Sequence, residues 1–391
     1  MKILKTCLSK SWGGMEMYAL QTSQFLLELG YEVELLCYPG SRIHREAVRN
    51  KIPVFQFPFD HYFCPKLILN LNRHLRNKNF DVIHAEASKD LWLIVPALKL
   101  SSINIPLFLT KHVGSYIKKK DLLHRWIYHR VNMIFAISNV IKKNLIETTP
   151  LNDDHICLLH DPVDVNKFNP ALIDRSKVRK EFNISDDELL IGMNARMTFG
   201  KGHEEFLHSA KQLSLKHKNL KFMIVGEASR GEDKYAASVK SLAYELGLND
   251  KLIFTGYRND IPEVLAAFDI FAFPSHDEAF GIALIEAMSM KLPTVCTNYG
   301  GVLDIAVNGK TSLLFQRKNE YDLEQKLNLL INDPIRRKQF GVAARNHVER
   351  YFSKDSFIKK LKIIYTNAVS TRSISLKDYN TFLNPPPVFH T

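Results

Sequence analysis

Short apolar runs alternate along this chain with longer stretches of helical period, and the alternation occurs in two successive series. The apolar runs of the first series are 2–9, 32–37, 80–85, 106–112, 133–138 and 155–160, and those of the second are 189–196, 221–226, 251–256, 269–275 and 293–297. Strands that are separated by helical crossovers usually pair in parallel. We therefore predict an α/β protein that contains two doubly wound, Rossmann-like parallel sheets.

The two series of strands predict two domains. The length of 391 residues exceeds the size at which a single hydrophobic core usually stops growing. Between the two series lies the polar, proline-containing segment 161–177, which suits a linker. We predict an N-terminal domain over 1–165 and a C-terminal domain over 166–351. We also expect 352–391 to return to the N-terminal domain and to include an extended tail around "NPPP" at 384–387.

The charge balance of the chain favours anionic partners. Lys and Arg number 53 against 41 Asp and Glu, which gives a formal net charge of +12. Nucleic acid, a phosphorylated substrate and an acidic membrane face would all suit this excess. The charges are spread along the chain, without the basic stripe and interleaved aromatic residues that typify nucleic-acid modules. We expect no nucleic-acid partner, and a basic nucleic-acid-binding protein is kept as an alternative.

Three features of the sequence bear on the location of the protein. The longest apolar run near the middle of the chain, 91–98, contains a proline and is far shorter than the roughly 20 residues that cross a bilayer. The first residues lack the apolar core of a signal peptide. The five cysteines are scattered and have no C-x-x-C spacing. We expect a cytoplasmic protein whose cysteines are reduced and bind no metal.

The loops that follow the predicted strands should carry the chemistry, because ligands of doubly wound sheets bind beyond the carboxyl ends of the strands. Two such edges could face each other across a cleft. Gly13 and Gly14 precede a predicted helix, whose free amides can hold an anion. Arg196 and Lys201 lie on one strand-exit loop, and His112 ends another strand. These loops suit an anionic ligand.

The segment "SHDEAFGIALIEAM" (275–288) places two carboxylates near the start of one predicted helix. If the helix begins at about Phe280 or Gly281, Glu278 stays in the preceding loop while Glu286 lies one to two turns along the helix. A diphosphate would fit the free amides between them together with the two cations described above. One carboxylate could then accept hydrogen bonds from sugar hydroxyls on one side of the diphosphate, and the other carboxylate from hydroxyls on the opposite side. This layout suits a nucleotide-sugar donor.

Several ordered motifs are similar to those of a known enzyme family. The segment "PSHDEAFGIALIEAM…LPTV" resembles the E-x7-E signature of retaining GT-B glycosyltransferases, specifically glycosyltransferase family 4. "HDPVDVNKFNP", "NARMTFGKG" and "FTGYRNDIPEVLAAFDIFAFPS" resemble further motifs of that family in the same order. The resemblance covers Lys2 to about residue 365. It implies a GT-B fold, with two Rossmann-like doubly wound domains facing across a cleft.

The resemblance also implies roles for individual residues. Glu286 would bind the ribose hydroxyls of the nucleotide, and Glu278 the hydroxyls of the transferred sugar. Arg196 and Lys201 would neutralise the diphosphate and stabilise it as a leaving group. The remaining implied contacts come from four places in the chain. The donor would be contacted by the backbone of Phe280, Gly281 and Ile282, and its phosphates by Gly13 and Gly14. The sugar would lie beside His112, and the base beside Tyr257 and Arg258.

The activity implied by the resemblance is that of a retaining hexosyltransferase. It would move a sugar from a nucleotide-diphosphate sugar, for which we favour a UDP-sugar, to a glycan or lipid-linked acceptor. The implied setting is cell-surface polysaccharide or lipopolysaccharide biosynthesis. No metal or other cofactor is expected, because two fixed cations and the helix amides would take over the role of a divalent ion.

Other interpretations of the same residues remain open at this point. A glycosidase would use Glu278 and Glu286 as acid and nucleophile, but the cationic loop would then have no role. Each site residue also has a structural interpretation, as a solvated charge, a turn glycine or a satisfied histidine.

The segment 118–130 has two interpretations. It places Leu122, Leu123, Trp126 and Ile127 on one helical face, with basic and polar residues opposite. This apolar face could pack into the N-terminal domain. It could instead dock on an anionic membrane so that the enzyme reaches a lipid-linked acceptor. Peripheral contact with the inner face of the cell membrane is therefore a further hypothesis.

Overall fold

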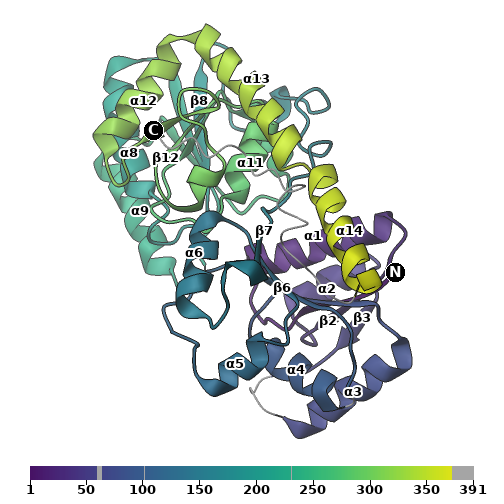
Figure 1. Ribbon diagram of the computed structural model, residues 1–391. Helices are drawn as coiled ribbons and strands as arrows, with labels where there is room; N and C mark the ends of the chain where they lie inside the picture. The colour runs from purple at the N-terminus through teal and green to yellow at the C-terminus, as the bar shows by residue number, and fades with distance from the viewer. Residues whose placement is uncertain (60–63, 101, 230, 372–391) are drawn as a thin grey trace. The chain divides into compact units, whose positions relative to one another are not determined.

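The computed structural model describes residues 1–371 apart from 60–63, 101 and 230, and it divides into two compact units. The N-terminal unit contains Met1–Asp161 together with the segment that begins at Asp355 (Figure 1). The C-terminal unit contains Pro162–Lys354. The expected tail at 384–387 lies outside the described residues.

The N-terminal unit is built on a parallel sheet with the strand order β3-β2-β1-β4-β5-β6-β7. Its strands are β1 (Lys2–Cys7), β2 (Glu32–Cys37), β3 (Val54–Gln56), β4 (Val82–Ala85), β5 (Leu107–Lys111), β6 (Met133–Ala136) and β7 (Ile156–Leu158). Its helices are α1 (Gly14–Glu28), α2 (Arg42–Arg49), α3 (Pro65–Lys78), α4 (Leu91–Leu100), α5 (Leu122–Tyr128), α6 (Asn139–Thr148) and α14 (Lys354–Thr371). The edge strand β3 was not predicted, because three residues are too few to show a periodic pattern.

Helix α1 shows how the local sequence sets the crossover from β1 to β2. Tyr18, Phe25 and Leu26 are buried against the sheet, so one face of the helix contributes to the core. The helix ends at Glu28, and Gly30, two residues later, has a φ of 79°, which lies in the left-handed region that favours glycine. The Gly30 amide donates to the Leu27 carbonyl at 2.9 Å, which turns the chain directly into β2.

Helix α14 completes the core of the N-terminal unit. Phe357, Leu361, Ile364 and Tyr365 are buried in one cluster with side chains from β1, β4, β5 and β6. The Tyr365 hydroxyl also lies 2.5 Å from Nδ1 of the buried His84 on β4. The chain therefore returns from the C-terminal unit to supply apolar area that the first 161 residues do not contain.

The C-terminal unit is built on a second parallel sheet with the order β10-β9-β8-β11-β12-β13. Its strands are β8 (Leu189–Asn194), β9 (Leu220–Val225), β10 (Leu252–Gly256), β11 (Ile270–Phe273), β12 (Thr294–Thr297) and β13 (Ser312–Phe315). Its helices are α7 (Ser176–Glu181), α8 (His203–Lys216), α9 (Asp233–Glu245), α10 (Ile261–Ala267), α11 (Ile282–Ser289), α12 (Glu320–Asn332) and α13 (Pro334–Tyr351). The core packs so closely that a Cβ on Gly192 of β8 would lie 2.1 Å from the Phe268 ring.

Both sheets have the strand order of a doubly wound Rossmann-like fold, which confirms the predicted fold class. In each sheet the order of connection reverses at one place. That place lies between β1 and β4 in the N-terminal unit and between β8 and β11 in the C-terminal unit. Ligands of such sheets bind at the carboxyl ends of the strands beside the reversal. The loops after these four strands are therefore where each unit can hold a ligand.

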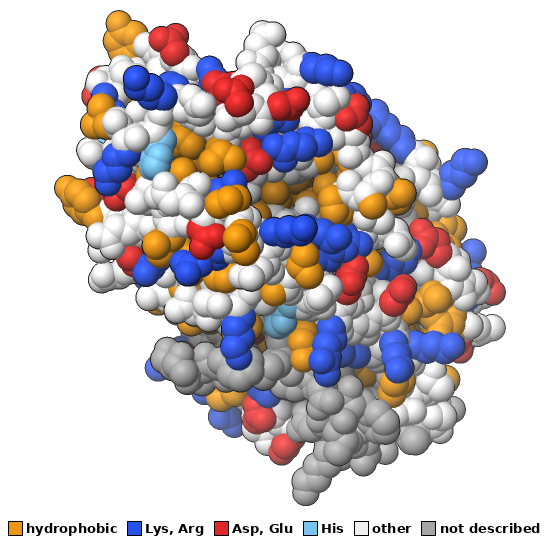
Figure 2. Space-filling view, turned by 90° about the horizontal axis from the view of Figure 1, so that it is seen from above, with side chains coloured by type: hydrophobic (Ala, Val, Ile, Leu, Met, Phe, Trp, Pro, Cys, Tyr) orange, Lys and Arg blue, Asp and Glu red, His pale blue; other side chains and the backbone are white. Residues whose placement is uncertain are grey.

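The surface and the helices bear on the kinds of partner. On the face shown in Figure 2, Lys and Arg side chains lie among acidic and apolar side chains. Within the ranges described by the structure, no helix has both the length and the apolar character that a membrane span requires.

The packing of α14 predicts a large loss of stability when its buried side chains are shortened. Leu361→Ala should lower the free energy of unfolding by about 2–5 kcal/mol, because it leaves a cavity in the core of the N-terminal unit. Lys359→Ala, at an exposed position of the same helix, is the matched control. Urea unfolding of both variants measures the difference. Equal midpoints would contradict this role of α14.

Candidate functional site

The loop after β8 carries Arg196 at the reversal point of the C-terminal sheet. Its backbone continues the pairing with the loop after β9, since the Met197 amide donates to the Glu227 carbonyl at 2.9 Å. Arg196 itself is exposed, and Nη1 lies 3.3 Å from Ser229 Oγ. A fixed backbone thus presents this guanidinium to solvent at the carboxyl edge of the sheet.

The same loop docks directly on the loop that follows β11. Gly202 has a φ of 79°, and a Cβ at this position would lie 2.2 Å from the Pro274 carbonyl oxygen. The His276 amide also donates to the Gly200 carbonyl at 2.8 Å. Only a residue without a side chain allows this approach.

The contact between the two loops brings together two of the predicted site residues. Lys201 Nζ lies 2.5 Å from Glu278 Oε1, and Ser275 Oγ donates to the same oxygen at 2.9 Å. Both charged side chains are about one-fifth exposed, at 21% and 18%. The Glu278 carboxylate is therefore held by two donors while its edge remains accessible.

A glycine pair that was not predicted supports the Glu278 loop from the next strand. The Gly301 amide donates to the Glu278 carbonyl at 2.8 Å, and a Cβ on Gly301 would lie 2.3 Å from the Ala279 carbonyl oxygen. Gly300 has a φ of 67°. The sequence signal was "YGG" directly after the β12 strand, at the same sheet edge as the other site loops.

Helix α11 begins at Ile282, directly after Gly281, whose φ of 128° suits only glycine. This start lies within two residues of the predicted one. Phe280 is buried 5.8 Å from the Phe352 ring, which anchors the turn into the helix. The turn leaves the first amides of α11 without a side-chain cap, as the predicted anion site requires.

Glu286 lies on α11 in a half-buried position. Burial raises the pKa of its carboxyl group to about 7, and the charge of Lys167 opposes part of this shift. A carboxyl group in this environment is poorly solvated when ionised, so it would gain from hydroxyl donors of a ligand.

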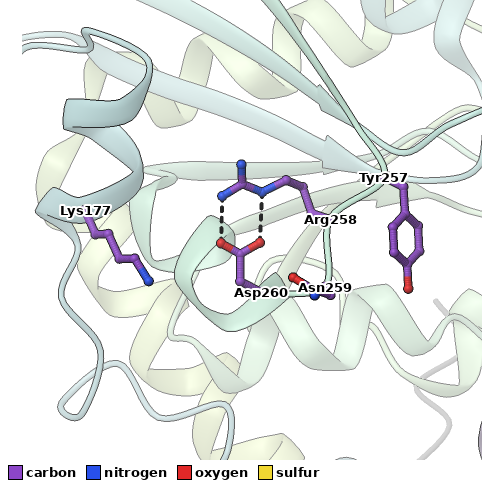
Figure 3. A pocket seen from close by; sticks show the side chains of 5 residues that line it. All are labelled: Lys177, Tyr257, Arg258, Asn259 and Asp260. Atoms are coloured by element: carbon purple, nitrogen blue, oxygen red, sulfur yellow. Dashed lines mark hydrogen bonds and ion pairs between the residues drawn. The ribbon is translucent and has the colours of Figure 1, made fainter. Parts of the chain in front are cut away.

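Tyr257 and Arg258 follow β10 and line a pocket of about 500 Å³ together with Lys177, Asn259 and Asp260 (Figure 3). Arg258 donates to Asp260 through Nε at 2.8 Å and through Nη2 at 2.6 Å, and to Glu181 through Nη2 at 2.9 Å. These hydrogen bonds raise the pKa of Arg258. Its guanidinium shapes the pocket wall, whereas the half-exposed Tyr257 ring presents a flat surface beside it.

In the N-terminal unit, Gly13 is the cap of α1 and Gly14 is its first residue. A Cβ on Gly14 would meet no atom within 4 Å, so packing within the unit leaves room for a side chain at this position. The buried carboxylate of Glu16 lies in the first turn of the helix, and it was not among the residues predicted from the sequence. Its negative charge already complements the helix dipole there.

His112, directly after β5, is part of a buried network. Its Nε2 lies 3.0 Å from Glu86 Oε2, and the other Glu86 oxygen forms an ion pair with Lys5 Nζ. Lys5 also donates to Thr22 Oγ1 at 2.7 Å. Burial alone would raise the pKa of Glu86, but Lys5, His84 and His112 hold it well below its usual value.

Lys5 and Glu86 were not predicted as site residues, although the position of each in or beside an apolar run of the sequence was informative. Both charged side chains are fully buried. Lys5 interrupts the apolar run of β1, and Glu86 directly follows the apolar run of β4. A charge in a strand that is covered on both faces needs a partner, and the sheet order makes β1 and β4 neighbours.

The structure thus places the predicted residues at the carboxyl edges of both sheets, in two groups. Arg196, Lys201 and Glu278 lie at the reversal point of the C-terminal sheet, and Glu286 lies on the helix that follows. Phe280, Gly281 and Ile282 form the turn into that helix, and Tyr257 and Arg258 lie two strands away, after β10. Gly13, Gly14 and His112 belong to the N-terminal unit.

Two family models match the chain. The model "Glycosyltransferase Family 4" matches residues 12–167, and "Glycosyl transferases group 1" matches residues 174–347. Among curated proteins, the capsular polysaccharide biosynthesis glycosyltransferase CapM of Staphylococcus aureus is 27% identical over 241 residues, which span 59% of this chain and 60% of that protein.

Solved structures share the fold over nearly the whole chain. A glycosyltransferase from Rickettsia africae ESF-5 has a TM-score of 0.85 and 25% identity, and covers 95% of this chain and 99% of its own. Anabaena HepE, solved in complex with UDP and glucose, has a TM-score of 0.80 and 21% identity, and covers 93% of this chain and 98% of its own. Both matches agree with a GT-B fold made of two Rossmann-like domains.

Removal of one partner of the buried Lys5–Glu86 ion pair should strongly destabilise the protein. Glu86→Gln should lower the free energy of unfolding by about 3–5 kcal/mol, because Lys5 would stay buried without its counter-charge. Glu32→Gln breaks the exposed pair with Lys2 in the same unit and should cost less than about 1 kcal/mol. Urea unfolding compares them. A loss in Glu86→Gln no larger than in the control would disprove the role of the pair.

The raised pKa of Glu286 predicts that this residue makes stability depend on pH. The folded protein binds the Glu286 proton more tightly than the unfolded chain does. The protonated carboxyl group therefore stabilises the fold at low pH, and this contribution is lost as the pH rises from about 4.5 to about 7. Glu286→Gln removes the charged form and should raise stability at about pH 8 by on the order of 1–3 kcal/mol, with little effect near pH 4.5.

The control for this prediction is Glu245→Gln, at an exposed position of α9 in the same unit. Thermal unfolding at both pH values gives the comparison. If Glu286→Gln destabilised the protein at the higher pH, its carboxylate would be a stabilising group and the prediction would be wrong.

Proposed function

Because this chain belongs to the glycosyltransferases of family 4 and group 1, we propose that it is a retaining hexosyltransferase that uses a UDP-sugar. The acceptor in this proposal is a glycan or a lipid-linked sugar of cell-surface polysaccharide or lipopolysaccharide biosynthesis. The observation that carries the proposal is the joined loop pair at the β8/β11 reversal, where Lys201, from the loop that also carries Arg196, and Ser275 hold Glu278.

The choice of donor and acceptor rests on the relatives. HepE was solved with UDP and glucose, which supports a uridine nucleotide and a hexose. CapM is named for capsular polysaccharide biosynthesis, which supports a cell-surface glycan as the product. The half-exposed Tyr257 ring beside the pocket provides a flat surface on which a base could stack.

The chemistry follows from the charges at the loop pair. As the bond between C1 of the sugar and the β-phosphate oxygen breaks, negative charge develops on the diphosphate. Arg196, Lys201 and the first amides of α11 stabilise that charge. The acceptor oxygen attacks C1 from the face that the diphosphate leaves, and its proton passes to a phosphate oxygen. The anomeric configuration is therefore retained, and no enzyme nucleophile is needed.

The two glutamates hold the donor on each side of the diphosphate. Both contacts of Glu278 involve Oε1, so we assign Oε2 to the hydroxyls of the transferred sugar. Glu286 accepts hydrogen bonds from the ribose hydroxyls, which also offset the cost of its burial. In the N-terminal unit, we assign His112 to the sugar and the amides at Gly13 and Gly14 to the phosphates.

The proposal includes a reaction without a metal and a cytoplasmic location on the inner face of the cell membrane. Two fixed cations at the carboxyl edge supply the positive charge that a divalent ion would otherwise provide. In this proposal the enzyme takes the donor from the cytoplasm and meets the acceptor at the membrane surface.

The function is tested by supplying the purified protein with UDP-, GDP- and ADP-linked α-sugars in the presence of EDTA. We expect release of UDP, and an α-linked product by NMR when an acceptor is present. Release that stops with EDTA would disprove the metal-independent mechanism, and a β-linked product would disprove retention. Absence of release with every donor would contradict the proposed function.

The assigned roles predict different kinetic effects within that assay. Glu286→Ala should raise KM for the donor about tenfold or more, since it removes ribose contacts. Arg196→Ala and Lys201→Ala should lower kcat by about 100-fold or more, since they act on charge that develops in the transition state. Lys218→Ala, an exposed cation before β9 at the opposite edge of the sheet, should change neither constant.

A further inference from the structure

An exposed apolar surface lies directly beside His112 in the N-terminal unit. We call it the 113–126 surface, and its exposed apolar side chains are Val113, Tyr116, Ile117, Leu122, Leu123 and Trp126. Tyr116 is fully exposed and Leu122 is 83% exposed. The interpretation that the face of 118–130 packs inward is correct for Ile127, which is buried, and wrong for Leu122, Leu123 and Trp126. Exposed apolar side chains concentrated in one short segment in this way usually mark an interaction surface.

The backbone beneath these side chains is firmly held, so their exposure is not the result of a loosely packed loop. The Asn144 side chain on α6 accepts from the Ser115 amide at 2.7 Å and donates to the Ser115 carbonyl at 3.0 Å. The Lys119 amide donates to the Thr148 carbonyl at 2.6 Å. Asp121 caps α5, which lies beside α4 (Figure 1).

Cations accompany the apolar side chains. Residues 111–130 contain six Lys or Arg (111, 118, 119, 120, 125 and 130) and one acidic residue, Asp121. Lys118, Lys120 and Arg125 are exposed. Asp121 is engaged with His124 at 2.5 Å. The surface therefore carries exposed positive charge at Lys118, Lys120 and Arg125 as well as apolar side chains.

This combination identifies the occupant. The core of a protein–protein interface is depleted of charged residues, whereas here lysines are interleaved with the apolar side chains. A second copy of the chain would bring like charges together. Tyr, Trp, Lys and Arg flanking aliphatic side chains are typical of surfaces that enter the headgroup layer of an anionic bilayer.

We propose that the 113–126 surface docks on an anionic phospholipid membrane and so presents a lipid-linked acceptor to the site. Strand β5 ends at Lys111, His112 follows, and the docking surface begins at the next residue. An acceptor whose lipid stays in the bilayer would thus have its head group close to His112. The acceptor part of this inference rests on the proposed function, whereas membrane binding itself does not depend on sugar transfer.

The test measures binding of the full chain to vesicles of phosphatidylcholine with and without phosphatidylglycerol. We expect binding to the anionic vesicles at least about tenfold stronger than to the neutral ones, and weaker at high salt. The combined variant Tyr116→Ser, Ile117→Ser and Leu122→Ser should lose about tenfold or more. Lys118→Glu with Lys120→Glu should abolish the preference for anionic vesicles.

The matched control is Leu172→Ser with Leu215→Ser, which removes exposed apolar side chains from the C-terminal unit. Thermal stabilisation by UDP, measured for every variant, reports the donor site and the fold separately from the membrane. Equal loss in the control, or no binding by the unaltered chain, would overturn the proposal. A dimer seen by sedimentation and abolished in the combined variant would identify a second copy as the occupant instead.

Discussion

The close approach of the loop after β8 to the loop after β11 determines the geometry of the C-terminal site. It depends on Gly202, whose missing side chain leaves room for the Pro274 carbonyl. Once the loops touch, Lys201 and Glu278 meet, and Ser275 adds a second donor to the same carboxylate oxygen. Residues that are 77 positions apart in the chain thereby become one unit of charge and hydrogen bonding. The parallel sheet makes this possible because β8 and β11 are neighbours.

The N-terminal sheet uses its own reversal point in a different way. There, β1 and β4 bring Lys5 to Glu86 in the interior, and Glu86 in turn holds His112 at the end of β5. A buried pair of this kind contributes little net stability but is costly to break. The pair fixes the orientation of the His112 imidazole through Glu86. The N-terminal unit thus offers a buried, fixed side chain, whereas the C-terminal unit offers the accessible charges of Lys201 and Glu278.

Much of this arrangement could be predicted from the sequence, and the failures have physical causes. Apolar runs such as those of β8 and β11 predicted the sheets, and the E-x7-E spacing predicted the Glu278 loop and α11. The three-residue strand β3 gave too little periodicity, and β13 was not predicted although it is as long as β11. The support from Gly301 and the pair of Lys5 with Glu86 depend on which strands become neighbours, and local sequence does not contain that information. The period of α5 also could not show that its apolar face is left uncovered.

The position of α14 has a consequence for how the protein is made at the ribosome. The N-terminal unit needs Leu361 and Tyr365 for its core, but these residues are synthesised after the whole C-terminal unit. At about 5–20 residues per second, the delay between Asp161 and Asp355 is roughly 10–40 s. During this time the nascent first unit exposes apolar surface, and the second unit can fold before the first is finished. The unit that is synthesised first is therefore the last to have all the side chains of its core available.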